Sequence, residues 1–138
     1  MKFVIEAQRA IAMVDDNPGD LVFAKTCFEK SKLTNPWLEF QSGSAFISYL
    51  ERVKLGEGTL PALVLMDINM PQMSGHQVLE RVRQDPFYRE VPVFCMLTGS
   101  AESVDRKRAS RLGADGFMVK PDSVRELIEF FNSLTTAG

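Results

Sequence analysis

The amino-acid sequence predicts an α/β protein with a doubly wound parallel sheet of five strands and with five helices. Two observations lead to this prediction. Short apolar segments, which are typical of strands buried on both faces, alternate five times with segments of helical periodicity. Strands that are separated by helices pair in parallel, with helices on both faces of the sheet. The chain has 138 residues, which suits a single domain.

Asp67 ends the clearest apolar segment, which begins at Leu63. Pro71 and Gly75 follow it and prevent the chain from continuing as a strand. Open α/β sheets bind their ligands at the carboxyl ends of the strands, where this position places Asp67. An ionised carboxylate at the rim of an apolar sheet needs a metal, a cation or several hydrogen bonds as its partner. Asp67 is therefore the first candidate functional residue.

Each predicted strand is an apolar segment closed by a turn signal, and each predicted helix has apolar residues at three- and four-residue intervals. We expect the strands at residues 10–14, 37–40, 63–67, 91–97 and 116–119. We expect the first helix between Asp20 and Asn35, and the others at about 44–55, 75–85, 102–112 and 124–134. Residues 1–8 have no assigned element.

Capping and breaking residues set the ends of these helices. Residues 15–20 form a dense helix-start signal, and Asn35-Pro36 ends the first helix. Ser74 is placed to cap the third helix, which ends at Asp85-Pro86, and Gly113 ends the fourth. The interior residues with helical spacing are Leu21, Ala24, Cys27, Phe28, Phe46, Ile47, Leu50, Val53, Val78, Leu79, Val82, Val124, Leu127, Ile128, Phe131 and Leu134.

The fourth helix differs from the others because its apolar stripe is thin. The stripe consists of Ala101, Val104, Ala109 and Leu112, and the residues between them are mostly charged. Because little apolar area holds this helix in place, we expect it to be the most mobile element. Its basic residues are interpreted as a solvated face, with a docking surface as the alternative.

Composition narrows the function classes. The net charge of −2 gives no basic patch for nucleic acid, and no apolar segment is long enough to span a membrane. Cys27 and Cys95 each lie in an apolar segment, which indicates buried reduced thiols. A cytoplasmic protein is expected. His76, the only histidine, is interpreted as a solvated helix residue, and Trp37 as a half-buried strand residue.

Polar residues follow four of the five predicted strands. They are Asp15 and Asp16, Asp67, Thr98 and Lys120. Right-handed crossovers favour the flavodoxin-like strand order 2-1-3-4-5, in which the first and third strands are neighbours. Whole helix and strand units separate these residues, so all of them are expected at one rim of the sheet.

This set of residues predicts metal-dependent phosphoryl chemistry. Clustered carboxylates repel one another, and a hard cation such as Mg²⁺, which accepts oxygen ligands and a phosphate, removes the conflict. Lys120 adds a second positive charge, and Thr98 adds a hydroxyl donor for a phosphoryl oxygen. Asp67 then remains as a carboxylate nucleophile.

Five short segments resemble the receiver domain of response regulators in two-component signalling. They are Met13-Val14-Asp15-Asp16-Asn17, Leu65-Met66-Asp67-Ile68-Asn69-Met70-Pro71 with Ser74-Gly75, Leu97-Thr98-Gly99, residues 112–117, and Val119-Lys120-Pro121. The resemblance covers about residues 9–135, so residues 1–138 are expected to form a single receiver domain. The Asp-Asn-Pro-Gly-Asp segment and the Gly-rich loop before Leu63 resemble the small regulators that partner phytochrome-type kinases.

The resemblance implies a role for each matching residue. Asp67 would accept a phosphoryl group from a phosphohistidine. Mg²⁺ or Mn²⁺ would be bound by Asp16, Asp67 and the backbone carbonyl of Asn69, and by Asp15 through water. Thr98 and Lys120 would contact the phosphoryl group. Phe117 would be the aromatic residue whose rotamer follows Thr98.

The resemblance also implies partners and a mode of action. A sensor histidine kinase, of the phytochrome type in the narrower match, would phosphorylate the chain. The change on the face formed by the fourth helix, fifth strand and fifth helix would act on a downstream protein or form a homodimer. Enzymatic activity would be limited to Mg²⁺-dependent self-phosphorylation and self-dephosphorylation. Gly99 departs from the pattern and should loosen the start of the fourth helix.

Other interpretations of these residues remain. Taken alone, Asp15 and Asp16 could cap a helix, Thr98 could be a turn residue and Lys120 a surface lysine. An aspartate-nucleophile phosphatase would need a second acid at the position of Asn69. A flavin-binding module would show as a bound yellow colour, and a degenerate receiver would lack some of the key side chains, all of which are present here.

Overall fold

The computed structural model describes residues 3–88, 93–99 and 103–138, and its central feature is one parallel sheet. The sheet contains β2 (Ile11–Val14), β3 (Trp37–Phe40), β4 (Leu63–Asp67), β5 (Val93–Thr98) and β6 (Gly116–Val119). Its order is β3-β2-β4-β5-β6, and every neighbouring pair is parallel. Counted along these five strands, this is the predicted order 2-1-3-4-5, so the fold prediction is confirmed.

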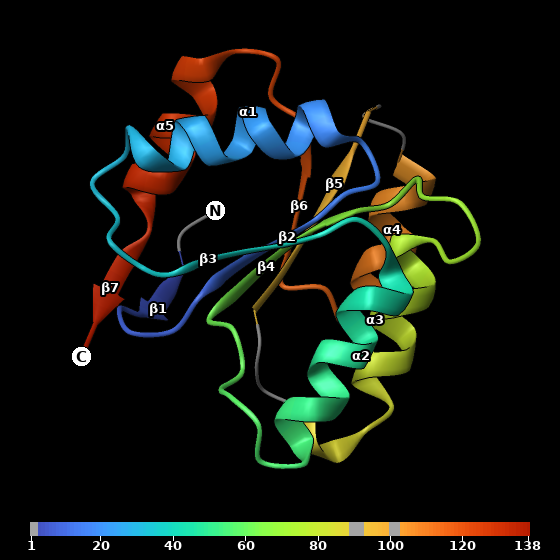
Figure 1. The fold of residues 1–138 in the computed structure, drawn as a ribbon. Helices are drawn as coiled ribbons and strands as arrows, with labels where there is room; N and C mark the ends of the chain where they lie inside the picture. The colour runs from blue at the N-terminus through green and yellow to red at the C-terminus, as the bar shows by residue number, and fades with distance from the viewer. Residues whose placement is uncertain (1–2, 89–92, 100–102) are drawn as a thin grey trace.

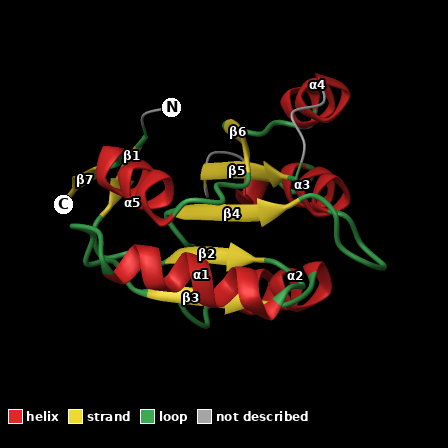
Figure 2. Ribbon diagram, turned by 90° about the horizontal axis from the view of Figure 1, so that it is seen from above, coloured by secondary structure: helices red, strands yellow, loops and turns green. Residues whose placement is uncertain are grey.

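Five α-helices connect the strands and cover both faces of the sheet (Figure 1). They are α1 (Pro18–Glu29), α2 (Gly43–Lys54), α3 (Gly75–Arg83), α4 (Ser103–Arg111) and α5 (Val124–Ser133), with a short 3₁₀ helix, η1 (Pro86–Tyr88), after α3. The arrows of β2, β4 and β5 point the same way in Figure 2, so their carboxyl ends lie at one edge.

Alternation along the strands divides the apolar interior into two clusters. Leu63 and Leu65 of β4 face the cluster under α1 and α5, whereas Val64 and Met66 face the cluster under α2, α3 and α4. Every residue of β2 and β4 is buried. A strand buried on both faces has no polar side, which is why the pattern of these segments is continuous rather than alternating.

The start of α3 is fixed against the end of β4. Ser74 and Gln77 form a capping box, as the sequence suggested for Ser74. The amide of Gly75 donates to the carbonyl of Ile68 at 2.9 Å. A Cβ atom at Gly75 would lie 2.3 Å from the carbonyl oxygen of Asp67, so only glycine allows this close approach. This contact holds the segment after Asp67 in place.

The chain termini form a small second sheet that the sequence did not predict. β1 (Val4–Glu6) pairs in parallel with β7 (Thr135–Ala137), beside the carboxyl end of α5. Ile5 is buried in the cluster under α1 and α5. Each strand has three residues, which is too short to show a periodic pattern.

Several boundaries and environments differ from the sequence-based expectations. Helix α1 ends at Glu29, before Asn35, and Leu33 packs into the core from the following loop. In α4, Ala109 is buried but Val104 is 69% exposed, so Val104 does not belong to the buried stripe. Ala101 and the expected strand residues 91–92 lie outside the described residues.

The prediction for His76 is wrong, whereas those for the cysteines and Trp37 are confirmed. His76 is 2% exposed because it faces α4, where its Nε2 lies 3.6 Å from a carboxylate oxygen of Asp105. Cys27 and Cys95 are buried free thiols, and Trp37 is half-buried. No helix in the described residues is long and apolar enough to cross a membrane.

Candidate functional site

The candidate site lies at the carboxyl edge of the five-stranded sheet. Asp67 is the last residue of β4, and Asp15 and Asp16 follow β2, its neighbour in the sheet. Thr98 is the last residue of β5, and Lys120 follows β6. The backbone amide of Lys120 donates to the carbonyl of Thr98 at 2.7 Å. The fold therefore brings together the five residues that the sequence placed at this rim.

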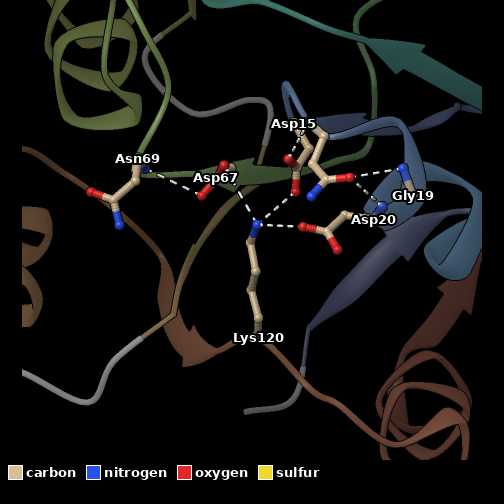
Figure 3. Close-up of polar contacts among 7 residues, drawn as sticks. Asp15, Gly19, Asp20, Asp67, Asn69 and Lys120 are labelled. Carbon is tan, nitrogen blue, oxygen red and sulfur yellow. Dashed lines mark hydrogen bonds and ion pairs between the residues drawn. The ribbon is translucent and has the colours of Figure 1, made fainter.

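Lys120 is the centre of the site (Figure 3). Its Nζ lies 2.9 Å from Asp15 Oδ2, 2.8 Å from Asp20 Oδ2 and 3.5 Å from Asp67 Oδ2. The lysine side chain is 25% exposed, whereas that of Asp67 is 4% exposed. These contacts raise the pKa of Lys120 against the opposing effect of burial, so the ammonium group keeps its charge.

Asp67 is an acid in an environment that disfavours its charge. Burial and the neighbouring Asp15 raise its pKa to about 6, while Lys120 and a hydrogen bond from the Asn69 amide act in the opposite direction. That amide donates to Asp67 Oδ1 at 3.2 Å, which leaves Oδ2 directed toward Lys120. The carboxylate is thus oriented by its neighbours, with one oxygen on the side where the charged groups converge.

Asp15, Asp16 and Asp67 form a cluster that fits a divalent cation. One carboxylate oxygen from each can be chosen so that all three lie within 4.8 Å of one another. Asp15 and Asp67 are buried, and Asp16 is exposed. Mg²⁺ and Mn²⁺ favour carboxylate oxygens as ligands and keep some of their bound waters. The exposed position of Asp16 leaves room for such waters. Burial and the neighbouring Asp15 raise the pKa of Asp67, and a cation bound beside its carboxylate would favour the ionised form.

Asp20 lies in the candidate site, although its sequence pattern predicts only the start of a helix. It lies in the first turn of α1, which Asn17 caps by accepting hydrogen bonds from the amides of Gly19 and Asp20. This cap directs Asp20 back over the sheet edge, where it pairs with Lys120. The signal that could have identified it is its position. Asp20 is an acid in the first turn of the helix that follows Asp15 and Asp16.

Thr98 and Phe117 lie on the side of the site that faces α4. Thr98 is fully buried, and Phe117 in β6 is half-buried against the cluster under α2, α3 and α4. The Arg106 guanidinium of α4 lies over the Phe117 ring, 5.2 Å from its centroid. Thr98 at the end of β5 and the Phe117 ring in β6 therefore lie between the candidate site and the exposed surface of α4.

Comparison with known sequences identifies a family for nearly the whole chain. The model of the response regulator receiver domain matches residues 11–132. The "Probable methanogenesis regulatory protein FilR2" of Methanothrix harundinacea is 29% identical over 126 residues, which is 90% of this chain and 81% of that protein. The "Polar-differentiation response regulator DivK" of Brucella ovis is 29% identical over 125 residues, 91% of this chain and 94% of that protein. Some relatives are longer: the chain spans 48% of the "Response regulator Rre1" of Synechocystis sp..

Solved structures of response regulators have a similar fold. The "bacteriophytochrome response regulator AtBRR" is 32% identical, with a TM-score of 0.75 and coverage of 91% of each chain. The "Mn(2+)-bound form of response regulator Rcp1" has a TM-score of 0.76 at 21% identity, and the match covers 90% of this chain and 89% of that one. At that identity the second likeness concerns the fold alone.

Proposed function

This chain belongs to the response regulator receiver domain family of two-component signalling, and we propose that it is a phosphoacceptor switch whose phosphorylated residue is Asp67. A phosphohistidine of a sensor histidine kinase would be the donor. The observation that carries the proposal is the convergence of Lys120 and four carboxylates at the carboxyl edge of the sheet, those of Asp15, Asp16, Asp20 and Asp67.

Asp67 is suited to the role of nucleophile. Its Oδ2 would attack the phosphorus atom while the P–N bond of the phosphohistidine breaks, which leaves an acyl phosphate on Asp67. With a pKa of about 6, the carboxyl group is mostly ionised near neutral pH. Lys120 would pair with the transferred phosphoryl group, and the hydroxyl of Thr98 would donate a hydrogen bond to it. Asn69 offers no acid to a leaving group, which argues against a phosphatase.

Asp15, Asp16, Asp67 and the backbone carbonyl of Asn69 would hold Mg²⁺ or Mn²⁺. The bound cation would neutralise charge on the transferring phosphoryl group. The carboxylate cluster supports this assignment. The protein's only reactions would be its own Mg²⁺-dependent phosphorylation and dephosphorylation.

Phosphorylation would act on a surface through Thr98 and Phe117. Thr98 would move toward the phosphoryl group, and Phe117 would fill the space that it leaves. The face formed by α4, β6 and α5 would then change shape. This is a shift between two conformations, driven by contacts that only the phosphorylated state makes.

The kinase and the target are proposed from the relatives and the surface. The bacteriophytochrome regulator among the structural neighbours supports a phytochrome-type sensor kinase as the donor. Residues 1–138 would act as a single receiver domain, and the altered face would bind a downstream protein or a second copy of the chain. We expect this to take place in the cytoplasm, without nucleic acid or a membrane as partner.

The test is phosphorylation by acetyl phosphate in the presence and absence of Mg²⁺, followed by mass spectrometry and by Trp37 fluorescence. The wild-type chain should gain one phosphoryl group only with Mg²⁺. Asp67→Asn should gain none, whereas Glu57→Gln, which changes an exposed carboxylate, should behave as the wild type. Phosphorylation of Asp67→Asn at another residue would overturn the assignment.

A further inference from the structure

Helix α4 presents a basic surface that the proposed chemistry does not use. We call it the α4 surface, and its residues, all of them exposed, are Val104, Arg106, Lys107, Arg108, Ser110 and Arg111. The helix carries four basic residues and one acidic residue, although the chain has a net charge of −2. Within the part of the chain that the structure describes, none of these four cations forms an ion pair.

The α4 surface also has an apolar component. A shallow depression of about 470 Å³ is lined by Val104, Lys107, Ser110 and Arg111. A second one, of about 150 Å³, lies between α4 and β6 and is lined in part by Arg106, Ser110 and Phe117. Ser110 lines both, so the two depressions adjoin. Apolar contact area flanked by unpaired cations fits a protein segment that carries both apolar and acidic side chains.

Arg106 connects this surface to the candidate site. Its guanidinium lies over the ring of Phe117, at a distance typical of a cation–π contact. In the proposed switch Phe117 turns inward after Thr98 moves. The ring would then no longer lie under Arg106, and the guanidinium would be available to a carboxylate of a partner.

We propose that the α4 surface binds an acidic segment of the downstream protein, and that Arg106 makes this binding depend on phosphorylation at Asp67. The coupling rests on the proposed function, because it requires Phe117 to change its position. Lys107 and Arg111 supply attraction in both states, and Arg106 adds to it only in the phosphorylated state.

The observations favour a protein segment over nucleic acid as the occupant. The net charge of −2 gives no long-range attraction for a polyanion. Val104 is 69% exposed and lines a depression together with Lys107 and Arg111, and a phosphate backbone would leave that apolar area unused. Arginine beside exposed apolar side chains is typical of protein interfaces.

The coupling can be tested without a partner by NMR of the arginine side chains. In the unphosphorylated protein the Arg106 side-chain resonances should show the ring-current shift of Phe117, and Phe117→Leu should abolish it. Addition of Mg²⁺ and beryllofluoride, a phosphoryl mimic, should reduce this shift in the wild type. A shift that persists after the mimic has bound would overturn the role of Arg106.

The occupant can be tested by fluorescence anisotropy with labelled peptides. The probe is a helical peptide of Glu, Leu and Ala with an apolar stripe, and the control peptide has Lys in place of Glu. The acidic peptide should bind about ten-fold more tightly when beryllofluoride is present, and less tightly at high salt. Arg106→Ala should remove the dependence on beryllofluoride, and Lys107→Glu should weaken binding in both states. Lys25→Glu, an exposed change on α1, should have no effect.

Further measurements show whether the α4 proposal or the proposed function has failed. Equal binding of the Lys peptide, or tighter binding of a single-stranded oligonucleotide, would overturn the assignment of an acidic protein segment. Fluorine NMR reports whether beryllofluoride binds at all. If it binds and the acidic peptide does not, only the α4 proposal fails. If it does not bind, the proposed function fails, and the Arg106 coupling with it.

Discussion

The buried environment of Asp67, the proposed phosphoacceptor, has an energetic cost. Burial and Asp15 raise its pKa from 3.8 to about 6. The folded protein therefore binds more protons at this group than the unfolded chain does at pH values between these two. Its stability should fall as the pH rises through this range, and the cost is complete above about pH 6.

Asp67→Asn should therefore stabilise the metal-free fold near neutral pH. The amide has a similar shape and no charge, so the expected gain in the free energy of unfolding is on the order of 1–3 kcal/mol. Urea denaturation in the presence of EDTA measures it. The gain should disappear near pH 4, where the wild-type carboxyl group is protonated in the folded state. A variant less stable than the wild type at neutral pH would contradict this account.

Addition of Mg²⁺ should reverse the order of stability. A cation that binds the folded wild-type cluster would add stability that grows with the logarithm of its concentration above Kd, whereas Asp67→Asn has lost one of the three carboxylates. Wild-type protein should thus gain thermal stability with Mg²⁺ and lose that gain on chelation. Because protonation of Asp67 competes with the cation, the gain should shrink below about pH 6. An equal Mg²⁺ effect on the variant would exclude this site.

His76 should have the opposite pH dependence. Burial and the neighbouring Arg108 lower its pKa, and Asp105 opposes them only in part. The unfolded chain then takes up a proton at His76 before the folded protein does, so stability should fall on acidification below about pH 6.5. His76→Phe should flatten this part of the urea-denaturation profile and fold normally, since neither ring nitrogen has a hydrogen-bond partner among the described residues. An unchanged profile would assign the effect to another group.

Among the elements, the segment between β5 and α4 contains a glycine that sterics do not require. Among the described residues, a Cβ atom at Gly99 would meet no atom within 4 Å, and Gly99 is not one of the glycines with positive φ. Gly99→Ala should stabilise the protein by about 0.4–1 kcal/mol, because it restricts the unfolded chain. Chemical denaturation measures the gain, with Gly75→Ala as the opposite case, since a Cβ there meets the Asp67 carbonyl. A loss of stability in Gly99→Ala would show that the segment needs glycine.

The elements also show where sequence reasoning succeeds. The strands and helices around the site have long or strongly apolar patterns, so their order in the sheet could be predicted. The polar residues of the site lie at the ends of these strands, so the positions of five of them could be predicted as well. β1 and β7 could not be predicted, because a strand of three residues is too short to show a periodic pattern. Their pairing also joins segments from the two ends of the chain. Asp20 and His76 were misjudged for a related reason. Their environments come from contacts with Lys120 and α4, which are distant in sequence.

In the whole molecule, α4 is the α-helix that buries the fewest apolar side chains among the described residues. Its carboxyl end is anchored, because Arg83 of α3 donates to the carbonyl of Gly113 at 3.1 Å and pairs with Asp115 at 2.9 Å. Its middle contributes the small side chain of Ala109 to the core, and Val104 near its start faces solvent. We therefore expect the amino end of α4 to move relative to its fixed carboxyl end. The amino end is the one that lies nearest to Thr98 along the chain.

Amide hydrogen exchange of the whole chain should reveal this gradient. Amides of β2 and β4, which are fully buried, should exchange slowest, and those in the amino-terminal half of α4 should exchange faster than those of α3. Beryllofluoride with Mg²⁺ should slow exchange in α4 and β6 in the wild type and leave Asp67→Asn unchanged, because only the wild type can bind the mimic at Asp67. Protection in α4 equal to that in α3 before the mimic is added would mean that α4 is already fixed. The switch would then have to act through Phe117 and Arg106 without movement of the helix.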